Sequence, residues 1–335
     1  MFDPLLYAAP VFVVAMVVEG IALRRTSAPY TTRSVVSALG CVALDQLVNA
    51  STLALFAMAY DAVHREASVA RADGVLGWIL AIVLHDLAYY AFHRASHRVT
   101  FLWAAHVVHH QSETYDFTVS LRQGTVATWI TFLFYLPVAL VVPAETFIFV
   151  HAGYQIYQFF VHTRFVRTLG PLEWFIATPS HHRVHHGRDR EYMDKNYGGI
   201  FILFDRLLGT FAREKQEPKY GVPGGYDMVS PLFANTYLFL RLVAASKKTK
   251  GLRELAGLWL GPPEKNAGLL SSAGHAPRAS DRMGWAFVPF ALGCLGAIVL
   301  TFARAQVPAL GAVLVGLGSI ILVELGSASL DRRSA

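Results

Sequence analysis

Charged residues are scarce in this chain of 335 residues: only 16% are Asp, Glu, Lys or Arg, against 54% hydrophobic residues. That balance excludes an ordinary soluble domain of this size. Cysteine is rarer still, since Cys41 and Cys294 are the only two and stand far apart within apolar segments. Two such residues exclude a disulfide framework and a thiolate metal site, and they predict small buried side chains.

The hydrophobic residues fall into long runs, which predict an all-α integral membrane protein. A helix needs about 20 apolar residues to cross the hydrocarbon layer, and a helix satisfies its own backbone there. Runs of about this length, some only just long enough, cover residues 5–23, 35–60, 75–92, 126–142, 145–162, 286–303 and 307–324. We therefore expect about seven transmembrane helices. Arg24 and Arg25 follow the first run without a cleavage site, which favours a retained anchor over a signal peptide.

Basic residues beside the runs predict the orientation, because cytoplasmic loops carry an excess of Lys and Arg. Arg24, Arg25 and Arg33 place the first loop in the cytoplasm, although Arg65 and Arg71 in the next loop oppose this assignment. Counting spans from there puts residues 94–125 and 163–285 on the cytoplasmic side, as a helical cap. The net charge of +6 flanks the spans instead of forming a stripe, so we expect no nucleic-acid partner. The expected location is a bacterial inner membrane.

Eleven of the fourteen histidines cluster in two stretches, residues 85–110 and 162–186. They form three boxes: His93-x-x-x-His97, His106-x-x-His109-His110 and His182-x-x-His185-His186. Imidazole is the commonest metal ligand, and one ion takes only a few, so the boxes predict two metal ions. His162 closes the run 145–162 on the same side of the membrane. The predicted ligands are therefore His93, His97, His106, His109, His110, His162, His182, His185 and His186.

Spacing within the boxes supports two ions. Adjacent residues on a helix point about 100° apart, so His109-His110 and His185-His186 can each serve two different metals. An all-histidine site at a membrane favours iron, while zinc, manganese and copper stay open. Asp86, within the run 75–92, is expected either to accept the second ring N–H of a ligand histidine or to pair with an arginine.

Longer motifs around the boxes resemble a known superfamily. They include Asp86-x-x-x-Tyr90-x-x-His93-x-x-x-His97, Leu102-Trp103-Ala104-Ala105-His106-x-x-His109-His110, Thr178-Pro179-Ser180-His181-His182-Arg183-Val184-His185-His186 and Asp194-Lys195-Asn196-Tyr197-Gly198-Gly199. Over residues 75–225 the chain resembles the sterol desaturase and fatty acid hydroxylase superfamily of membrane di-iron oxygenases. Within it, the likeness is closest to the alkylglycerol monooxygenases, which act on ether lipids.

The resemblance implies two iron ions, O2 and hydroxylation of a lipid C–H bond, with electrons from outside the chain. The donor would be a tetrahydropterin, or a cytochrome b5 or ferredoxin partner. Downstream of the third box, Asn196 is expected to hold a ligand through its amide. Asp205 and Arg206 are expected to form an ion pair, the alternative being a weak surface salt bridge.

Alternatives stay open at this stage. The same centre would serve a sterol or fatty acyl hydroxylase or desaturase, and a metal carrier or an inactive scaffold would also retain the histidines. The expected division of the chain is residues 1–74, N-terminal helices; 75–225, catalytic domain; 226–284, cytoplasmic segment and linker; 285–335, C-terminal transmembrane hairpin and tail.

Overall fold

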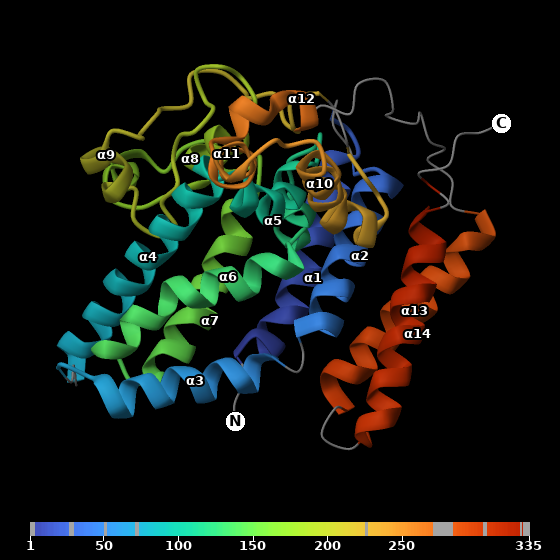
Figure 1. Cartoon of the computed structure of the whole chain (residues 1–335), viewed down its shortest axis with the longest axis horizontal. Coiled ribbons are helices and arrows are strands. Elements are labelled where there is room, and N and C mark those ends of the chain that lie inside the picture. Colours follow the sequence, from blue (N-terminus) through green and yellow to red (C-terminus); the bar gives the residue numbers. More distant parts are fainter. Residues whose placement is uncertain are drawn as a thin grey trace.

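A computed structural model describes residues 4–26, 30–49, 52–70, 74–224, 227–270, 284–303, 307–328 and 330. Long helices occupy the predicted apolar runs (Figure 1). They are α1 (Pro4–Leu23), α2 (Thr32–Asn49), α3 (Thr52–Ala67), α4 (Gly74–Arg98), α6 (Thr125–Tyr135), α7 (Ala144–Val161), α13 (Phe287–Ala303) and α14 (Ala309–Ala328). Described residues outside these and the shorter helices form loops, with one isolated bridge between Ile176 and Phe201. The all-helical prediction is confirmed for this part of the chain.

Three helical stretches are long and apolar enough to cross a membrane: Gly74–Arg98, Gly284–Thr301 and Gly311–Ala328. A bent pair of helices, Thr32–Asn49 with Ala54–Ala67, raises the number to 4 when it is taken as one span. The apolar helices Tyr7–Leu23 and Thr125–Leu140 are shorter. An integral membrane protein is thus supported, and the total of seven spans stays a prediction.

The run 35–60 differs from its prediction as one continuous helix. Helix α2 ends at Asn49, and the pair of helices bends by 57°. Polar side chains favour this end of α2, since Asn49 Nδ2 donates to Asp45 Oδ1 over 2.6 Å. Helix α3 then lies across the lower end of the bundle in Figure 1. There Tyr60 donates to the Val142 carbonyl at 3.1 Å, and His64 Nδ1 lies 2.7 Å from the Ala139 carbonyl.

Most of the remaining helices gather at the end of the bundle opposite α3 and form a cap (Figure 1). They are α5 (Thr100–His110), η1 (Phe117–Leu121), η3 (Gly170–Trp174), α8 (Pro179–His186), α9 (Leu203–Leu208), α10 (Pro231–Ser246), α11 (Leu252–Leu260), η4 (Pro263–Asn266) and α12 (Ala267–Leu270). The 3₁₀ turns η2 (Leu136–Leu140) and η5 (Gly284–Ala286) belong to the long-helix region. Of the expected linker, residues 263–270 are helical and residues 271–283 lie outside the described part.

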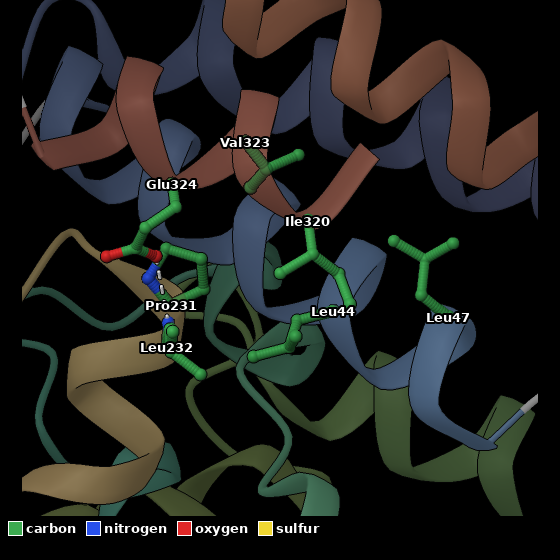
Figure 2. A pocket seen from close by; sticks show the side chains of 7 residues that line it. All are labelled: Leu44, Leu47, Pro231, Leu232, Ile320, Val323 and Glu324. Atoms are coloured by element: carbon green, nitrogen blue, oxygen red, sulfur yellow. Dashed lines mark hydrogen bonds between the residues drawn. The ribbon is translucent and has the colours of Figure 1, made fainter. Parts of the chain in front are cut away.

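The C-terminal hairpin packs beside α2. Helices α13 and α14 approach closely at Gly296, because this residue has no Cβ. A Cβ there would lie only 2.0 Å from Ser319 Oγ. Between α2, α14 and the start of α10 lies a shallow pocket, in which Glu324 faces Pro231 and Leu232 (Figure 2). Its carboxylate accepts from the hydroxyl of Ser230, the N-cap of α10, and from the Leu232 amide at 3.2 Å. A carboxylate at a helix N-terminus interacts favourably with the helix dipole, so this contact ties the hairpin to the cap.

We predict that Glu324→Ala lowers the stability of the folded protein by about 1–3 kcal/mol, because the Leu232 amide and the Ser230 hydroxyl lose their side-chain acceptor. Thermal unfolding in detergent measures the loss. Glu66→Ala removes an exposed carboxylate from the end of α3 and should leave the midpoint unchanged. Equal midpoints for the two variants would contradict the role given to Glu324.

Candidate metal centre

The first two boxes lie on consecutive helices with a sharp break between them. Helix α4 ends at Arg98, one residue after His97, and Val99 adopts an extended conformation. The Thr100 amide donates to the Gly261 carbonyl at 2.9 Å, which fixes the start of α5. Helix α5 ends on His109 and His110. The break turns α5 back so that both boxes face the same region of the cap.

The third box occupies α8, a helix of 8 residues whose two ends are fixed locally. Thr178 is the N-cap and Pro179 follows at the first helical position, where a missing N–H costs nothing. The Thr178 amide donates to His181 Nδ1 at 3.2 Å. His181 therefore caps its own helix and points away from the other imidazoles. This agrees with the box pattern, which begins at His182.

The structure brings the nine predicted ligands together in two groups. The ligand nitrogens in each group lie within 4.8 Å of one another. The first histidine group is His93, His97, His106, His110 and His185; the second histidine group is His109, His162, His182 and His186. None of the nine side chains is more than 8% exposed. Their role as metal ligands stays a prediction, but their convergence is a property of the fold.

Both adjacent pairs divide between the groups. His109 belongs to the second group and His110 to the first, and His186 and His185 divide in the same way. Within each group the Nε2 atoms approach closely: His185 and His110 at 3.2 Å, His182 and His162 at 3.0 Å. Two nitrogens bound to one ion at about 2.0–2.1 Å lie about 3 Å apart when they are cis on an octahedron. The spacing therefore fits shared coordination.

Backbone carbonyls fix the orientation of several rings. His93 Nδ1 lies 2.9 Å from the Tyr197 carbonyl oxygen, and His185 Nδ1 lies 2.9 Å from the Lys195 carbonyl oxygen. His162 Nδ1 lies 2.6 Å from the Gln158 carbonyl. A carbonyl only accepts, so each Nδ1 carries the proton and each Nε2 presents its lone pair to the group.

Two further observations fit a metal. The Nε2 atoms of His93 and His97 are buried and have no hydrogen-bond partner in the described structure. Burial lowers the pKa of His185 to about 4, and burial together with neighbouring imidazoles lowers the pKa of His110 and His182 well below the usual value. These side chains are therefore neutral at pH 7, the state in which imidazole binds metal.

Asp86 has a different partner from either of those expected. Its carboxylate accepts from the backbone amides of Ile200 at 2.7 Å and Phe201 at 2.8 Å, not from a histidine or an arginine. Asp86 thereby holds the segment that carries the Tyr197 carbonyl. Tyr197 lies three residues before Ile200, and its carbonyl oxygen lies 2.9 Å from His93 Nδ1. The orienting acceptors are main-chain carbonyls, which no side-chain pattern in the sequence reveals.

Asn196 also acts on the backbone. Its amide donates to the carbonyls of His181 at 3.1 Å and Ala212 at 2.8 Å, and its Oδ1 accepts from the Ala212 amide at 2.8 Å. The residue adopts a positive φ of 55°, which asparagine tolerates better than most residues. Asn196 therefore ties α8 to the segment that follows α9, without touching a ring of either histidine group.

The expected ion pair between Asp205 and Arg206 is wrong. Asp205 accepts from the amides of Tyr197 at 2.8 Å and Gly198 at 2.7 Å. The Arg206 guanidinium instead lies 4.6 Å from the Trp174 ring centroid and 3.8 Å from that of Phe211. The two side chains leave α9 in different directions, a difference that adjacency in sequence conceals.

Sequence reasoning missed a third carboxylate. Glu19, buried in α1, accepts from Thr163 Oγ1 at 2.6 Å and from the Phe117 amide at 2.7 Å. Thr163 directly follows His162, so α1 fixes the surroundings of the second histidine group. A lone acidic residue in the apolar run 5–23 was the signal, since a carboxylate within a membrane helix is costly and has a specific role.

Two buried arginines brace the boxes in the cap. Arg183, inside the third box, donates to both carboxylate oxygens of Glu214, at 2.7 and 2.6 Å. Arg122 donates to Asp227 at 2.7 Å and to the Val108 carbonyl at 3.2 Å, just before His109. Such charged pairs hold planar geometry well. They make α5 and α8 rigid supports for both histidine groups.

We predict that Asp205→Asn lowers the affinity for Co²⁺, a spectroscopic substitute for iron, by about 10- to 100-fold. Asparagine keeps one acceptor oxygen but has an NH2 donor in place of the other, so it cannot accept from both the Tyr197 and the Gly198 amides. The Tyr197 carbonyl then orients His93 less well. Titration of metal-free protein with Co²⁺, followed by visible absorption, measures the change. Asp61→Asn on α3, where the Asp61 side chain is 47% exposed, is the control. An unchanged affinity in Asp205→Asn would remove this residue from the metal centre.

Comparisons with known proteins agree with the site. The fatty acid hydroxylase family matches residues 78–210, which include both histidine groups. Alkylglycerol monooxygenase of Danio rerio is 42% identical over 196 residues, covering 57% of this chain and 43% of the relative. The human alkylglycerol monooxygenase is 42% identical over 161 residues, covering 48% and 36%.

A bacterial relative is more distant. Ornithine lipid hydroxylase OlsE of Rhizobium tropici is 28% identical over 135 residues, covering 40% of this chain and 41% of that protein. The chain thus spans less than half the length of these relatives. No solved structure matches.

Proposed function

Since residues 78–210 belong to the fatty acid hydroxylase family, we propose that this protein is a membrane-bound, O2-dependent di-iron monooxygenase that hydroxylates a lipid C–H bond. The observation that carries the proposal is the division of nine buried histidines into two groups. A single catalytic or structural metal needs about four protein ligands. Nine convergent ligands divided by helix geometry support two neighbouring ions.

In this proposal the first histidine group holds one iron and the second holds the other. Bound iron would supply the oxygen-activating chemistry. The protein keeps the imidazoles neutral by burial and directs His93, His162 and His185 through main-chain carbonyls. Arg183 and Asp205 hold the supporting segments in place. Rigid protein around the histidine groups would exclude water, so that the lipid C–H bond is oxidised in place of side reactions with solvent.

An ether lipid of the alkylglycerol class is the proposed substrate. The names of the vertebrate relatives support this choice, and so does the position of the histidine groups at one end of the apolar helices. Hydroxylation of the carbon beside the ether oxygen gives a hemiacetal, which collapses to an aldehyde and glycerol. The bacterial relative, an ornithine lipid hydroxylase, supports a second candidate, hydroxylation of a membrane lipid that has no ether bond.

We assign the histidine groups to the cytoplasmic side of a bacterial inner membrane. Basic residues support this side by the positive-inside rule. Arg24 and Arg25 follow α1, whose Glu19 accepts from Thr163, Arg33 donates to the Asp227 carbonyl at 3.1 Å, and Lys247 and Lys248 follow α10. The proposed electron donor is external: a tetrahydropterin, or a cytochrome b5 or ferredoxin. The burial of both groups at one end of the bundle supports an enzyme over a metal carrier, whose ligands would line a path across the bilayer.

We predict about two irons per chain in protein purified under iron-replete, reducing conditions, and a partial loss of iron when one group is disrupted. His185→Ala removes a ligand of the first group and His109→Ala one of the second. We expect each variant to bind less iron than the wild type and the double variant to bind least. Elemental analysis with protein quantification measures the stoichiometry.

His64→Ala is the matched control, because His64 is a buried histidine on α3 outside both groups. It should retain the wild-type iron content. Zinc in place of iron, or the same iron content in all variants, would contradict the di-iron centre.

We predict that purified protein converts an alkylglycerol to an aldehyde when O2 and a reduced tetrahydropterin are supplied, and that His185→Ala lowers the rate by at least about 100-fold. Aldehyde release, measured by coupled oxidation, and consumption of O2 give the rate. A protein that binds two irons but hydroxylates only a lipid without an ether bond would transfer the proposal to the second candidate.

A further inference from the structure

Six large apolar side chains stand exposed together at one edge of the cap. They belong to two segments, residues 172–175 and helix α9, that backbone hydrogen bonds hold together. The Phe175 carbonyl accepts from the Ile202 amide at 3.0 Å, and Ile176 forms a bridge with Phe201. Exposure ranges from 37% for Leu203 to 80% for Leu207. We name this surface the apolar rim; it consists of Leu172, Trp174, Phe175, Leu203, Leu207 and Leu208.

The height of the apolar rim along the bundle follows from its contacts with α4. Asp86 binds the Ile200 and Phe201 amides and is the middle residue of α4, which runs from Gly74 to Arg98. The apolar run of α4 ends at Phe92. Asp86 precedes Phe92 in α4. At a rise of 1.5 Å per residue, it lies about 9 Å deeper than Phe92, towards the middle of the span. The segment that leads into α9 therefore reaches below the polar end of this candidate membrane span.

Contacts with the next turn of α4 limit how far α9 lies from the middle of the span. The Tyr90 ring lies 5.8 Å from that of Phe204, and the Tyr90 hydroxyl lies 2.9 Å from Thr210 Oγ1. Helix α9 is thus held beside the last half of α4, at the outer edge of the cap (Figure 1). Non-helical backbone at membrane depth must be buried in protein. Residues 196–199 are buried, and Ile200 and Phe201 are half-buried with their amides bound by Asp86, whereas the leucines of α9 face outwards.

The arginine and tryptophan side chains beside the apolar rim are of the kind found in the headgroup layer of a bilayer. The Arg206 guanidinium lies over Trp174, and Arg94 Nη1 donates to the Tyr90 hydroxyl at 3.4 Å on the adjacent turn of α4. Tryptophan and arginine are typical of the headgroup layer, where an aromatic ring and a cation meet apolar chains on one side and phosphates on the other. Water-exposed leucines at this height would be costly.

We propose that the apolar rim is embedded in the cytoplasmic leaflet, so that the lipid bilayer is its partner and α9 lies in the membrane interface without crossing it. The occupant is the hydrocarbon region of the leaflet just beneath the headgroups. A second copy of the chain on this surface is the competing occupant. The proposal concerns the surface alone and holds whatever reaction the histidine groups perform.

Accessibility of nitroxide labels tests the proposal on full-length protein in vesicles of phosphatidylcholine and phosphatidylglycerol. The labels are attached at Leu207→Cys, Lys215→Cys and Leu314→Cys in a Cys294→Ala background. Cys41 is completely buried and should not react, which labelling of the background protein verifies. The three sites are similarly open, since Leu207 is 80% exposed, Lys215 74% and Leu314 61%. Lys215 represents the aqueous cap and Leu314 the lipid-facing surface of α14.

Power saturation compares collisions with O2, which partitions into lipid, and with a neutral Ni²⁺ chelate, which stays in water. We expect the O2-to-Ni²⁺ ratio at Leu207 to lie close to that at Leu314 and several-fold above that at Lys215. A ratio like that of Lys215 would overturn the proposal in favour of a water-exposed surface. Low accessibility to both reagents would overturn it in favour of a protein contact. Neither readout depends on iron or turnover, so failure here leaves the proposed function intact.

Discussion

The structure depends on keeping nine imidazoles neutral and convergent inside a helical protein. Buried imidazoles need partners for both ring nitrogens, and main-chain carbonyls supply them on the outer side for His93, His162 and His185. Among the described residues the inner Nε2 atoms of His93 and His97 then have no partner, a costly arrangement unless a metal completes it. The carboxylates of Asp86, Asp205 and Glu19 serve this constraint, because each holds the backbone around the histidine groups.

The long apolar helices and the cap both position the histidine groups. Helix α4 crosses from the apolar bundle into the cap and carries both Asp86 and the first box. Helix α1 reaches the surroundings of the second histidine group through Glu19, although it precedes the segment that matches the hydroxylase family. The C-terminal hairpin contacts α10 through Glu324. The apolar bundle thus positions the cap, and the cap encloses the histidines.

Local rules explain the division of ligands between the two groups. The boxes use adjacent histidines, and consecutive helix residues diverge by about 100°. His109 and His110 therefore face different groups, as do His185 and His186. Two helices, α5 and α8, each contribute to both groups. This sharing makes the two candidate metal sites interdependent, since displacement of either helix would disturb both.

Composition and spacing were enough to predict the helical class, the apolar runs, the nine candidate ligand histidines and the resemblance to a hydroxylase superfamily, whereas the convergence of those histidines in two groups is a property of the fold. The predicted features are periodic or local, so composition and spacing carry them. The bend after Asn49, the hydrogen-bond partners of Asp86 and the separation of Arg206 from Asp205 were decided only by the tertiary structure. Each depends on backbone groups brought close from distant parts of the chain, such as Ile200 beside Asp86, and main-chain amides and carbonyls are identical at nearly every position of a sequence.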